Sequence, residues 1–244
     1  MKAVIILIGI LVLVAACLIT RQFIVIQKAI QKLSYDNKPF VRINKEASQH
    51  FLFVGDSTAL GTGALDNRES VAGWFGQDFQ EASIENISAN GKKLYQLDAE
   101  FDVQGKRYDL IVIQIGGNDI MKLTPISESE THIRNLVRKA RKATSSLVIM
   151  HSGNVGLAPV FTWPFNWILT ERARQMRALY RRVAKEEGAY YIDLFTERSN
   201  DLFLKDIDRY YSPDHLHPSG QGYRWWYDRI RTTLKEAGVS LTTS

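Results

Sequence analysis

The sequence is poor in cysteine: Cys17 is the only one among its 244 residues. Cys17 lies in an apolar run near the amino terminus, so the rest of the chain can form no internal disulfide, and cysteine content leaves the cellular compartment undecided. Histidine is also sparse. His215 and His217 stand near Asp214, but the early Asp-x-His pair and the Asn-His block of dinuclear phosphoesterases are missing. We therefore expect no metal site.

A strong charge of either sign is also lacking. The 31 Lys and Arg residues exceed the 26 Asp and Glu residues by only 5. Basic residues gather in 134–142 and 172–182, mixed with apolar ones, which is typical of solvated helix faces rather than of a nucleic-acid surface. The sequence contains no nucleic-acid-reading motif. We expect no nucleic-acid partner, whereas an anionic membrane surface would suit the small positive excess.

A dinucleotide loop is incomplete. Gly61-Thr62-Gly63 has the first two glycines of such a fingerprint, but Asp66 stands where the third glycine belongs. No acidic residue ends a clear second strand to hold a ribose. We expect no nucleotide and no other organic cofactor.

Charge is absent from residues 3–20, which form one apolar stretch. Eighteen helical residues span about 27 Å, enough for the hydrocarbon core of a bilayer. The apolar character continues past Arg21, which favours an uncleaved signal anchor over a cleaved signal peptide. The run Val-Ala-Ala-Cys ending at Cys17 resembles a lipoprotein cleavage box, but the apolar residues after it suit a continuing transmembrane helix better.

The charges that flank the apolar stretch do not decide its orientation. Lys2 and the terminal amine stand on one side, and Arg21, Lys28 and Lys32 stand on the other. Because very short amino-terminal tails usually stay in the cytoplasm, we expect the bulk of the chain on the extracytoplasmic side, periplasmic or outside. We predict three parts: an anchor (1–21), a stalk and linker (22–48) with a helix to about Leu33 and a linker around Asn37, and a catalytic domain (49–244).

From residue 50 the apolar pattern alternates between short strand-like runs and longer helix-like ones. The predicted strands are 51–54, 83–88, 110–115, 147–150 and 189–194. The predicted helices are 71–79, 92–101, 127–143, 165–187 and 220–237. Strands separated by helices of this length indicate right-handed crossovers and a parallel sheet covered on both faces. The sequence predicts an α/β domain.

The first strand ends abruptly at Gly55-Asp56-Ser57-Thr58. A short apolar run closed by turn formers predicts a buried strand that leads through a tight turn into a helix. The hydroxyl of Ser57 would then lie at the carboxyl edge of the sheet, where open α/β folds bind their ligands. Ser57 is a candidate nucleophile, with the role of a simple helix cap as the alternative.

Polar residues or glycine follow other strands and precede the last helix. Gly91 follows the second strand and could present its N–H without side-chain obstruction, and Asn118 follows the third. Asp214 and His217 are three residues apart just before the last helix. At that spacing a carboxylate can accept the Nδ1–H of the imidazole and turn Nε2 outward as a base.

These blocks, in this order, resemble the SGNH (GDSL) hydrolase family. The resemblance implies a flavodoxin-like three-layer α/β/α sandwich with a five-stranded parallel sheet. It also implies that Ser57 is the nucleophile of a Ser-His-Asp triad, His217 the base and Asp214 its orienting partner. The N–H groups of Ser57 and Gly91 and the side-chain amide of Asn118 would form the oxyanion hole.

Aromatic residues are concentrated in two further places. The segment 159–169 carries Trp163, Phe165 and Trp167, which either pack at a helix start or form a rim that receives an acyl chain or touches the bilayer. We treat these three as candidate substrate-binding residues. Trp225 and Trp226, in the last predicted helix, are expected to pack in the core.

The sequence thus predicts a membrane-anchored serine esterase that needs no cofactor. Its expected substrate is a lipid-like acyl ester, a lysophospholipid or a thioester. An O-acetyl ester on cell-surface glycans is the alternative substrate, since the family resemblance covers both. The alternative of another class is a catalytically silent, membrane-bound binding or scaffold module.

Overall fold

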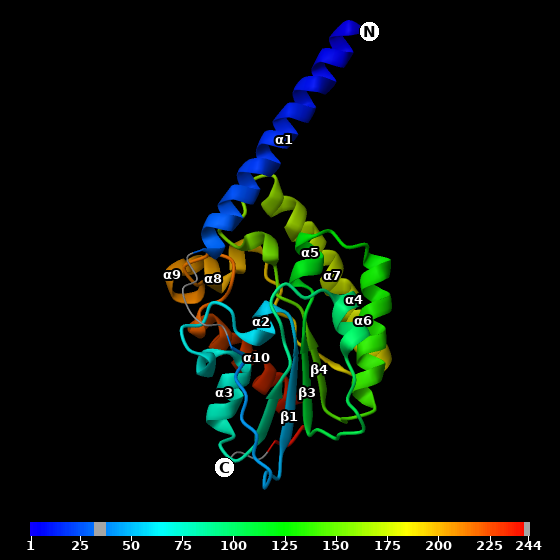
Figure 1. Ribbon diagram of the computed structural model, residues 1–244, viewed down its shortest axis with the longest axis vertical. Coiled ribbons are helices and arrows are strands. Elements are labelled where there is room, and N and C mark those ends of the chain that lie inside the picture. The colour runs from blue at the N-terminus through cyan, green and yellow to red at the C-terminus, as the bar shows by residue number, and fades with distance from the viewer. Residues whose placement is uncertain (32–37, 242–244) are drawn as a thin grey trace.

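The structure, a computed structural model, describes residues 1–31 and 38–241. A long helix, α1 (Lys2–Ile30), projects from a body built on a five-stranded sheet (Figure 1). The strands are β1 (His50–Gly55), β2 (Ser83–Asn86), β3 (Leu110–Gln114), β4 (Leu147–Met150) and β5 (Tyr190–Tyr191). They pair in the order β2-β1-β3-β4-β5, and all four pairings are parallel, as predicted.

Helices cover both faces of this sheet. One face packs against α4 (Leu94–Glu100), α6 (Ile126–Arg141) and α7 (Phe165–Glu187). The other packs against α3 (Val71–Asp78) and α10 (Gly220–Glu236). The body is therefore the predicted three-layer α/β/α sandwich. The short elements are α2 (Ser57–Leu60), η1 (Asn67–Glu69), α5 (Gly117–Met121), η2 (Val155–Leu157), η3 (Arg198–Asn200), α8 (Leu202–Lys205) and α9 (Ile207–Tyr210).

The central strand β3 is a continuous apolar run because it is covered on both faces. Ile111 and Ile113 pack into the core beneath α4, α6 and α7. Leu110 and Val112 point the other way, into the core beneath α3 and α10. Because both faces are covered, each position of the strand is buried, and the run shows no alternation with polar residues.

The last strand is shorter than predicted. Only Tyr190 and Tyr191 pair with β4, whereas the sequence predicted strand over 189–194. β5 is an edge strand, and its chain turns away at Asp193, whose carboxylate accepts hydrogen bonds from Arg177 of α7 at 2.7–3.0 Å. The Arg177–Asp193 ion pair thus lies where the chain leaves the edge of the sheet.

The strand order reverses between β1 and β3. From β1 the chain crosses to β2 at one side, and from β3 it crosses to β4 at the other, so the loops that leave β1 and β3 diverge and open a crevice at the carboxyl edge. The strands approach closely there: a Cβ at Gly55 would lie 1.8 Å from the carbonyl oxygen of Gln114. Only glycine fits. This edge of the sheet faces the end of the body from which α1 projects (Figure 1).

Helix α1 runs without interruption through the predicted anchor and into the predicted stalk. Among the described residues it is the one helix long and apolar enough to cross a membrane, with a mean hydropathy of 3.2 in its most apolar window. The predicted end of the stalk helix at Leu33 and the linker residue Asn37 lie outside the described residues. So do the last three residues of the predicted catalytic domain.

Candidate active site

Ser57 is the first residue of α2, two residues past the end of β1. The residue before it, Asp56, caps this helix: its Oδ1 accepts hydrogen bonds from the backbone N–H and the hydroxyl of Thr58 at 2.9 and 2.7 Å. Its Oδ2 accepts from the N–H of Gly117 at 3.3 Å. Asp56 thereby joins the turn after β1 to the turn after β3. Burial raises the pKa of Asp56, and the hydrogen bonds from Thr58 and Gly117 offset part of that rise.

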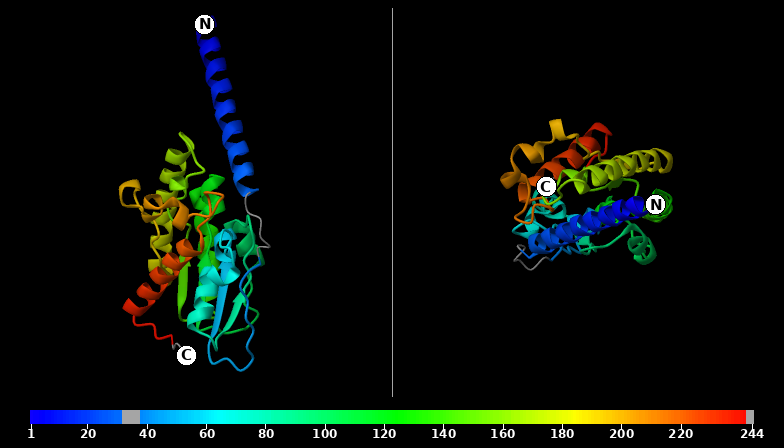
Figure 2. Two further views of the ribbon diagram at one scale, coloured as in Figure 1. Left: turned by 90° about the vertical axis from the view of Figure 1, so that its left-hand side faces the viewer. Right: turned by 90° about the horizontal axis from the view of Figure 1, so that it is seen from above.

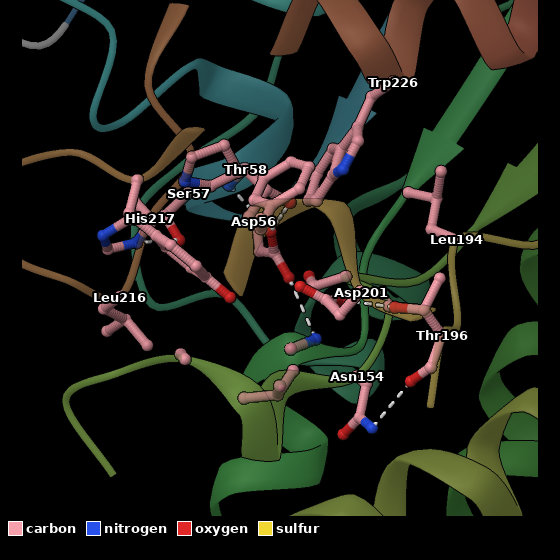
Figure 3. Close-up of a pocket in the computed structure, with 18 of the residues that line it drawn as sticks. Asp56, Ser57, Thr58, Asn154, Leu194, Thr196, Asp201, Leu216, His217 and Trp226 are labelled. Carbon is pink, nitrogen blue, oxygen red and sulfur yellow. Dashed lines mark hydrogen bonds between the residues drawn. The ribbon is translucent and has the colours of Figure 1, made fainter. Parts of the chain in front are cut away.

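Ser57, His217 and Asp214 form one hydrogen-bonded chain. The Ser57 hydroxyl lies 2.9 Å from Nε2 of His217 (Figure 3). Nδ1 of the same ring lies 2.6 Å from Oδ2 of Asp214. Ser57 and His217 are 160 positions apart in sequence, and the fold brings them together at the carboxyl edge of the sheet. With Nδ1 donating to the carboxylate, Nε2 is left to accept the serine proton.

The Asp214 carboxylate is held from several sides. Its Oδ1 accepts from the Ser212 hydroxyl at 2.6 Å and from the N–H groups of Leu216 and His217 at 2.9 Å. Burial pushes its pKa up, but the bonds from His217 and Ser212 outweigh burial, so the pKa of Asp214 lies below its usual value. The carboxylate therefore stays ionised at neutral pH and can stabilise an imidazolium at His217.

Hydrogen-bond donors stand beside the Ser57 hydroxyl. Ser57 begins a helix, and the N–H groups at a helix start have no partner within the helix. Asn118, in α5, lines the same cavity as Ser57, and its side-chain amide donates to the carbonyl of Lys92 at 3.1 Å. An amide nitrogen carries two hydrogens, so a second one remains for a ligand.

The predicted donor Gly91 lies in the loop next to Asn118, because its neighbour Lys92 accepts the Asn118 hydrogen bond. Its φ is +72°, and nothing lies within 4 Å of the position that a Cβ would take. Gly91 does not line the cavity itself. The structure thus brings Ser57, His217, Asp214 and Asn118 together and leaves Gly91 at the margin.

Ser57 and His217 open onto a shared cavity at the carboxyl edge of the sheet. In Figure 3 this pair lies on one side of the cavity, with Leu194 on the other and Trp226 above. Trp225, Trp226 and the neighbouring Phe203 make part of the wall aromatic. Trp226 is buried, as expected of a core residue, but it and Trp225 also shape the cavity, which their position in an amphipathic helix did not reveal.

A polar patch lies opposite Trp226 in the same cavity. The side chain of Asn154 donates from Nδ2 to the carbonyl of Thr196 at 3.0 Å, and the Thr196 hydroxyl donates to Asp201 (Figure 3). The Oδ1 of Asn154 and the Oγ of Ser152 are buried without a hydrogen-bond partner among the described residues. Sequence reasoning missed these residues. Asn154 and Ser152 follow β4, as Ser57 follows β1, and that shared position was the available signal.

The predicted aromatic rim lies elsewhere. Trp163, Phe165 and Trp167 do not line the cavity: Trp163 and Trp167 are exposed, and Phe165 packs partly against the core under α7. Within the described part of the chain, no group of three or more His, Cys, Asp or Glu side chains is arranged to hold a metal ion.

Solved structures with similar folds are esterases and related proteins. A G-D-S-L family protein from Desulfitobacterium hafniense DCB-2 is 18% identical with a TM-score of 0.61, over 77% of this chain and 100% of that one. The acetylxylan esterase Axe2 from Geobacillus stearothermophilus is 21% identical with a TM-score of 0.54, over 80% and 96%. TesA is 21% identical with a TM-score of 0.57, over 77% and 99%. At these identities the likeness shows the fold, which is that of the SGNH hydrolases.

A comparison with curated proteins gives no significant match. The model of a sequence family does match, over residues 53–225, a span that begins in β1 and ends in α10. It includes Ser57, Asn118, Asp214 and His217. The chain belongs to the GDSL-like lipase/acylhydrolase family and is an esterase of the SGNH/GDSL type.

Proposed function

We propose that the protein is a membrane-anchored serine hydrolase that cleaves carboxylic esters through Ser57, His217 and Asp214. The observation that carries this proposal is the chain of hydrogen bonds at 2.9 and 2.6 Å that joins these three side chains at the carboxyl edge of the sheet. A serine hydroxyl is a weak nucleophile unless a base takes its proton, and this arrangement supplies the base and its orienting carboxylate.

The reaction proceeds through an acyl-enzyme. The Ser57 oxygen attacks the ester carbonyl carbon while its proton passes to Nε2 of His217. The new oxyanion accepts hydrogen bonds from the Ser57 N–H and the Asn118 amide, with Gly91 as a third donor if its loop moves toward the ester. His217 then gives its proton to the departing alcohol. Water, deprotonated by His217, attacks the acyl-enzyme. His217 then returns the proton to the Ser57 oxygen as the acid leaves, which restores the free serine.

A lipid-like acyl ester, a lysophospholipid or a thioester is the proposed substrate. Two features support this class. The apolar helix α1 would keep the enzyme at a membrane, and the cavity next to Ser57 offers apolar surface from Leu194 and Phe203 to an acyl chain.

An O-acetyl ester on a cell-surface glycan is the second candidate, and a specific observation favours it. The buried, unpartnered Asn154 Oδ1 and Ser152 Oγ belong to residues that line the cavity together with Trp225 and Trp226. Buried acceptors without partners recognise hydroxyl groups, and a sugar presents hydroxyls together with an apolar ring face. The remaining alternative to a hydrolase is a catalytically silent, membrane-bound binding or scaffold module.

The experiment is a kinetic comparison of wild type with Ser57→Ala and His217→Ala, using a p-nitrophenyl ester series from acetate to palmitate. We expect both variants to lose at least about 10³-fold in kcat with unchanged melting temperature, and Ser127→Ala, on the exposed face of α6, to match wild type. A rate that rises with chain length supports the lipid substrate, and a preference for acetate supports the glycan. Equal rates in wild type and Ser57→Ala would support the scaffold.

A further inference from the structure

Helix α1 is fixed to the body just past the end of its uncharged apolar stretch, residues 3–20. Gln22, two residues past that stretch, is only 5% exposed. Its side chain donates to the carbonyl of Val160 at 2.9 Å and accepts from the N–H and hydroxyl of Thr162 at 3.2 Å. Further along the helix, Ala29 is buried and Val25 packs partly against the same core. The lower part of α1 is thus docked, and its upper part projects alone (Figures 1 and 2).

A single residue separates this docked helix from the catalytic loop. Val160 accepts from Gln22 through its carbonyl and donates through its N–H to the carbonyl of His215 at 3.2 Å. His215 lies between Asp214 and His217. The catalytic base therefore sits next to the place where α1 leaves the body.

Two exposed tryptophans lie in the segment that contacts Gln22 of α1. Trp163 follows Thr162, which is bonded to Gln22, and Trp167 lies in the first turn of α7; they are 72% and 69% exposed. Gln22 lies two residues past Thr20, or about 3 Å along the helix axis, so the segment that carries both indoles meets α1 just past its uncharged stretch. Figure 2 shows the start of α7 reaching up beside α1.

Other large apolar side chains are exposed in the segments at this end of the sheet. Among the described residues outside α1, most of the large exposed hydrophobic side chains lie in segments that leave the carboxyl ends of the strands, and two others, Val41 and Ile43, flank β2. The former are Leu65, Ile87, Tyr95, Leu123, Trp163 and Trp167. Single exposed apolar residues are ordinary on a soluble surface. Six of them occur in the segments that leave one edge of the sheet, the edge that faces the end from which α1 projects (Figure 1).

We propose that this end of the body rests on the surface of the bilayer that α1 enters, with Trp163 and Trp167 in the interfacial layer and the catalytic cavity held next to the headgroups. The proposal rests on the membrane anchor of the proposed function and assigns the side of the body that meets the lipid. Indoles suit this layer because they join an apolar ring to a polar N–H. The ester is then drawn from the same membrane surface.

The test is tryptophan fluorescence of the full chain in phosphatidylcholine vesicles that contain a headgroup nitroxide lipid. We expect the nitroxide to quench the wild type, and Trp163→Phe/Trp167→Phe to lose most of that quenching. Trp74→Phe, in α3 on the opposite face of the sheet from α7, keeps it. Quenching that is absent from the wild type, or unchanged in the double variant, would overturn the proposal.

Two readouts separate this outcome from failure of the proposed function. Resistance to alkaline carbonate reports insertion of α1, and turnover of soluble p-nitrophenyl acetate reports the hydrolase. Inserted, active protein without nitroxide quenching contradicts the docking alone. Release by carbonate removes the anchor and the docking together, and lost turnover without lost quenching contradicts only the hydrolase.

A variant of Gln22, the residue that joins α1 to the body, tests whether docking on the bilayer contributes to catalysis. Gln22→Leu keeps α1 apolar but removes the bonds to Val160 and Thr162. We expect a several-fold lower rate on a long-chain ester embedded in vesicles and an unchanged rate on soluble p-nitrophenyl acetate. Gln27→Leu, on the exposed side of α1, should change neither. Equal loss on both esters would mean that Gln22 acts through stability, against the proposal.

Discussion

Asn118 is positioned by a contact that its proposed chemistry does not use. One amide hydrogen goes to the carbonyl of Lys92, which fixes the side chain while the other hydrogen can meet an oxyanion. Such a fixed donor stabilises a transition state because it needs no rearrangement when charge develops.

Replacing the Asn118 side chain should therefore slow the acyl-transfer step and leave binding of the ester unchanged. We expect Asn118→Ala to lower kcat by about 10²–10³-fold with little change in KM. Steady-state kinetics on p-nitrophenyl acetate measures both quantities. Thr131→Ala, on the exposed face of α6, is the control. A rise in KM at constant kcat would assign Asn118 to substrate binding instead.

Single residues of the site differ in how well their sequence context predicts them. The Asp214–His217 pair is local, since three residues in one loop place an imidazole beside a carboxylate, and the structure has this contact at 2.6 Å. Asn154 and Asp201 are different: they meet in the cavity through Thr196, and no short spacing links them. Contacts between distant loops depend on the tertiary fold, so motif reasoning left them out.

At the scale of elements, β4, β5 and α7 meet around a buried histidine. His151 follows β4, and its Nε2 lies 3.0 Å from the hydroxyl of Tyr191 in β5, while its ring packs against Tyr180 of α7. Burial lowers the pKa of His151 to about 4. The unfolded chain, with an ordinary histidine pKa of about 6.5, thus binds a proton that the folded chain excludes.

This difference makes the junction sensitive to acid. Above a pH of about 6.5 His151 is neutral in both states, and as the pH falls toward 4 protonation of the unfolded chain lowers the free energy of unfolding by up to about 3 kcal/mol. We expect the melting temperature of His151→Gln to fall less than that of wild type as the pH is lowered from 7 to 4.5, measured by calorimetry in detergent. Parallel curves would contradict the role of His151.

Elements were predictable where burial alone decides them. The runs of β1, β3 and β4 are apolar because both faces are covered, and their bounds agree with the predictions within about two residues. The short helices α8 and α9 were not predicted. Each has only four residues and begins at an aspartate cap, Asp201 or Asp206, in a segment without helical periodicity.

For the whole molecule, sequence order cannot reveal which strands become neighbours. The step from β2 across β1 to β3 depends on packing of α3 and α10 on one face and α4, α6 and α7 on the other. The family resemblance supplied the five-stranded parallel sheet between two helical layers, and the alternation of strands and helices supplied the α/β class, but the strand order was not predicted. The position of α1 on the body was beyond both, because Gln22 gives no sign in sequence of its distant partners.

The orientation of the chain in the membrane remains a proposal at this scale. We propose that the body lies on the extracytoplasmic side of the membrane that α1 enters. Alkaline phosphatase fused after residue 244 should then be active in bacterial cells, since that enzyme needs disulfides that form outside the cytoplasm. A fusion of full length without phosphatase activity would place the body inside.

The most direct measurement of the central claim is the site of reaction with a fluorophosphonate, which forms a stable adduct with activated serines. Mass spectrometry of the labelled wild-type chain should find the phosphonyl group on the peptide that contains Ser57, and Ser57→Ala and His217→Ala should take up none. Folded wild type that stays unlabelled, or a phosphonyl group on another serine, would contradict the account.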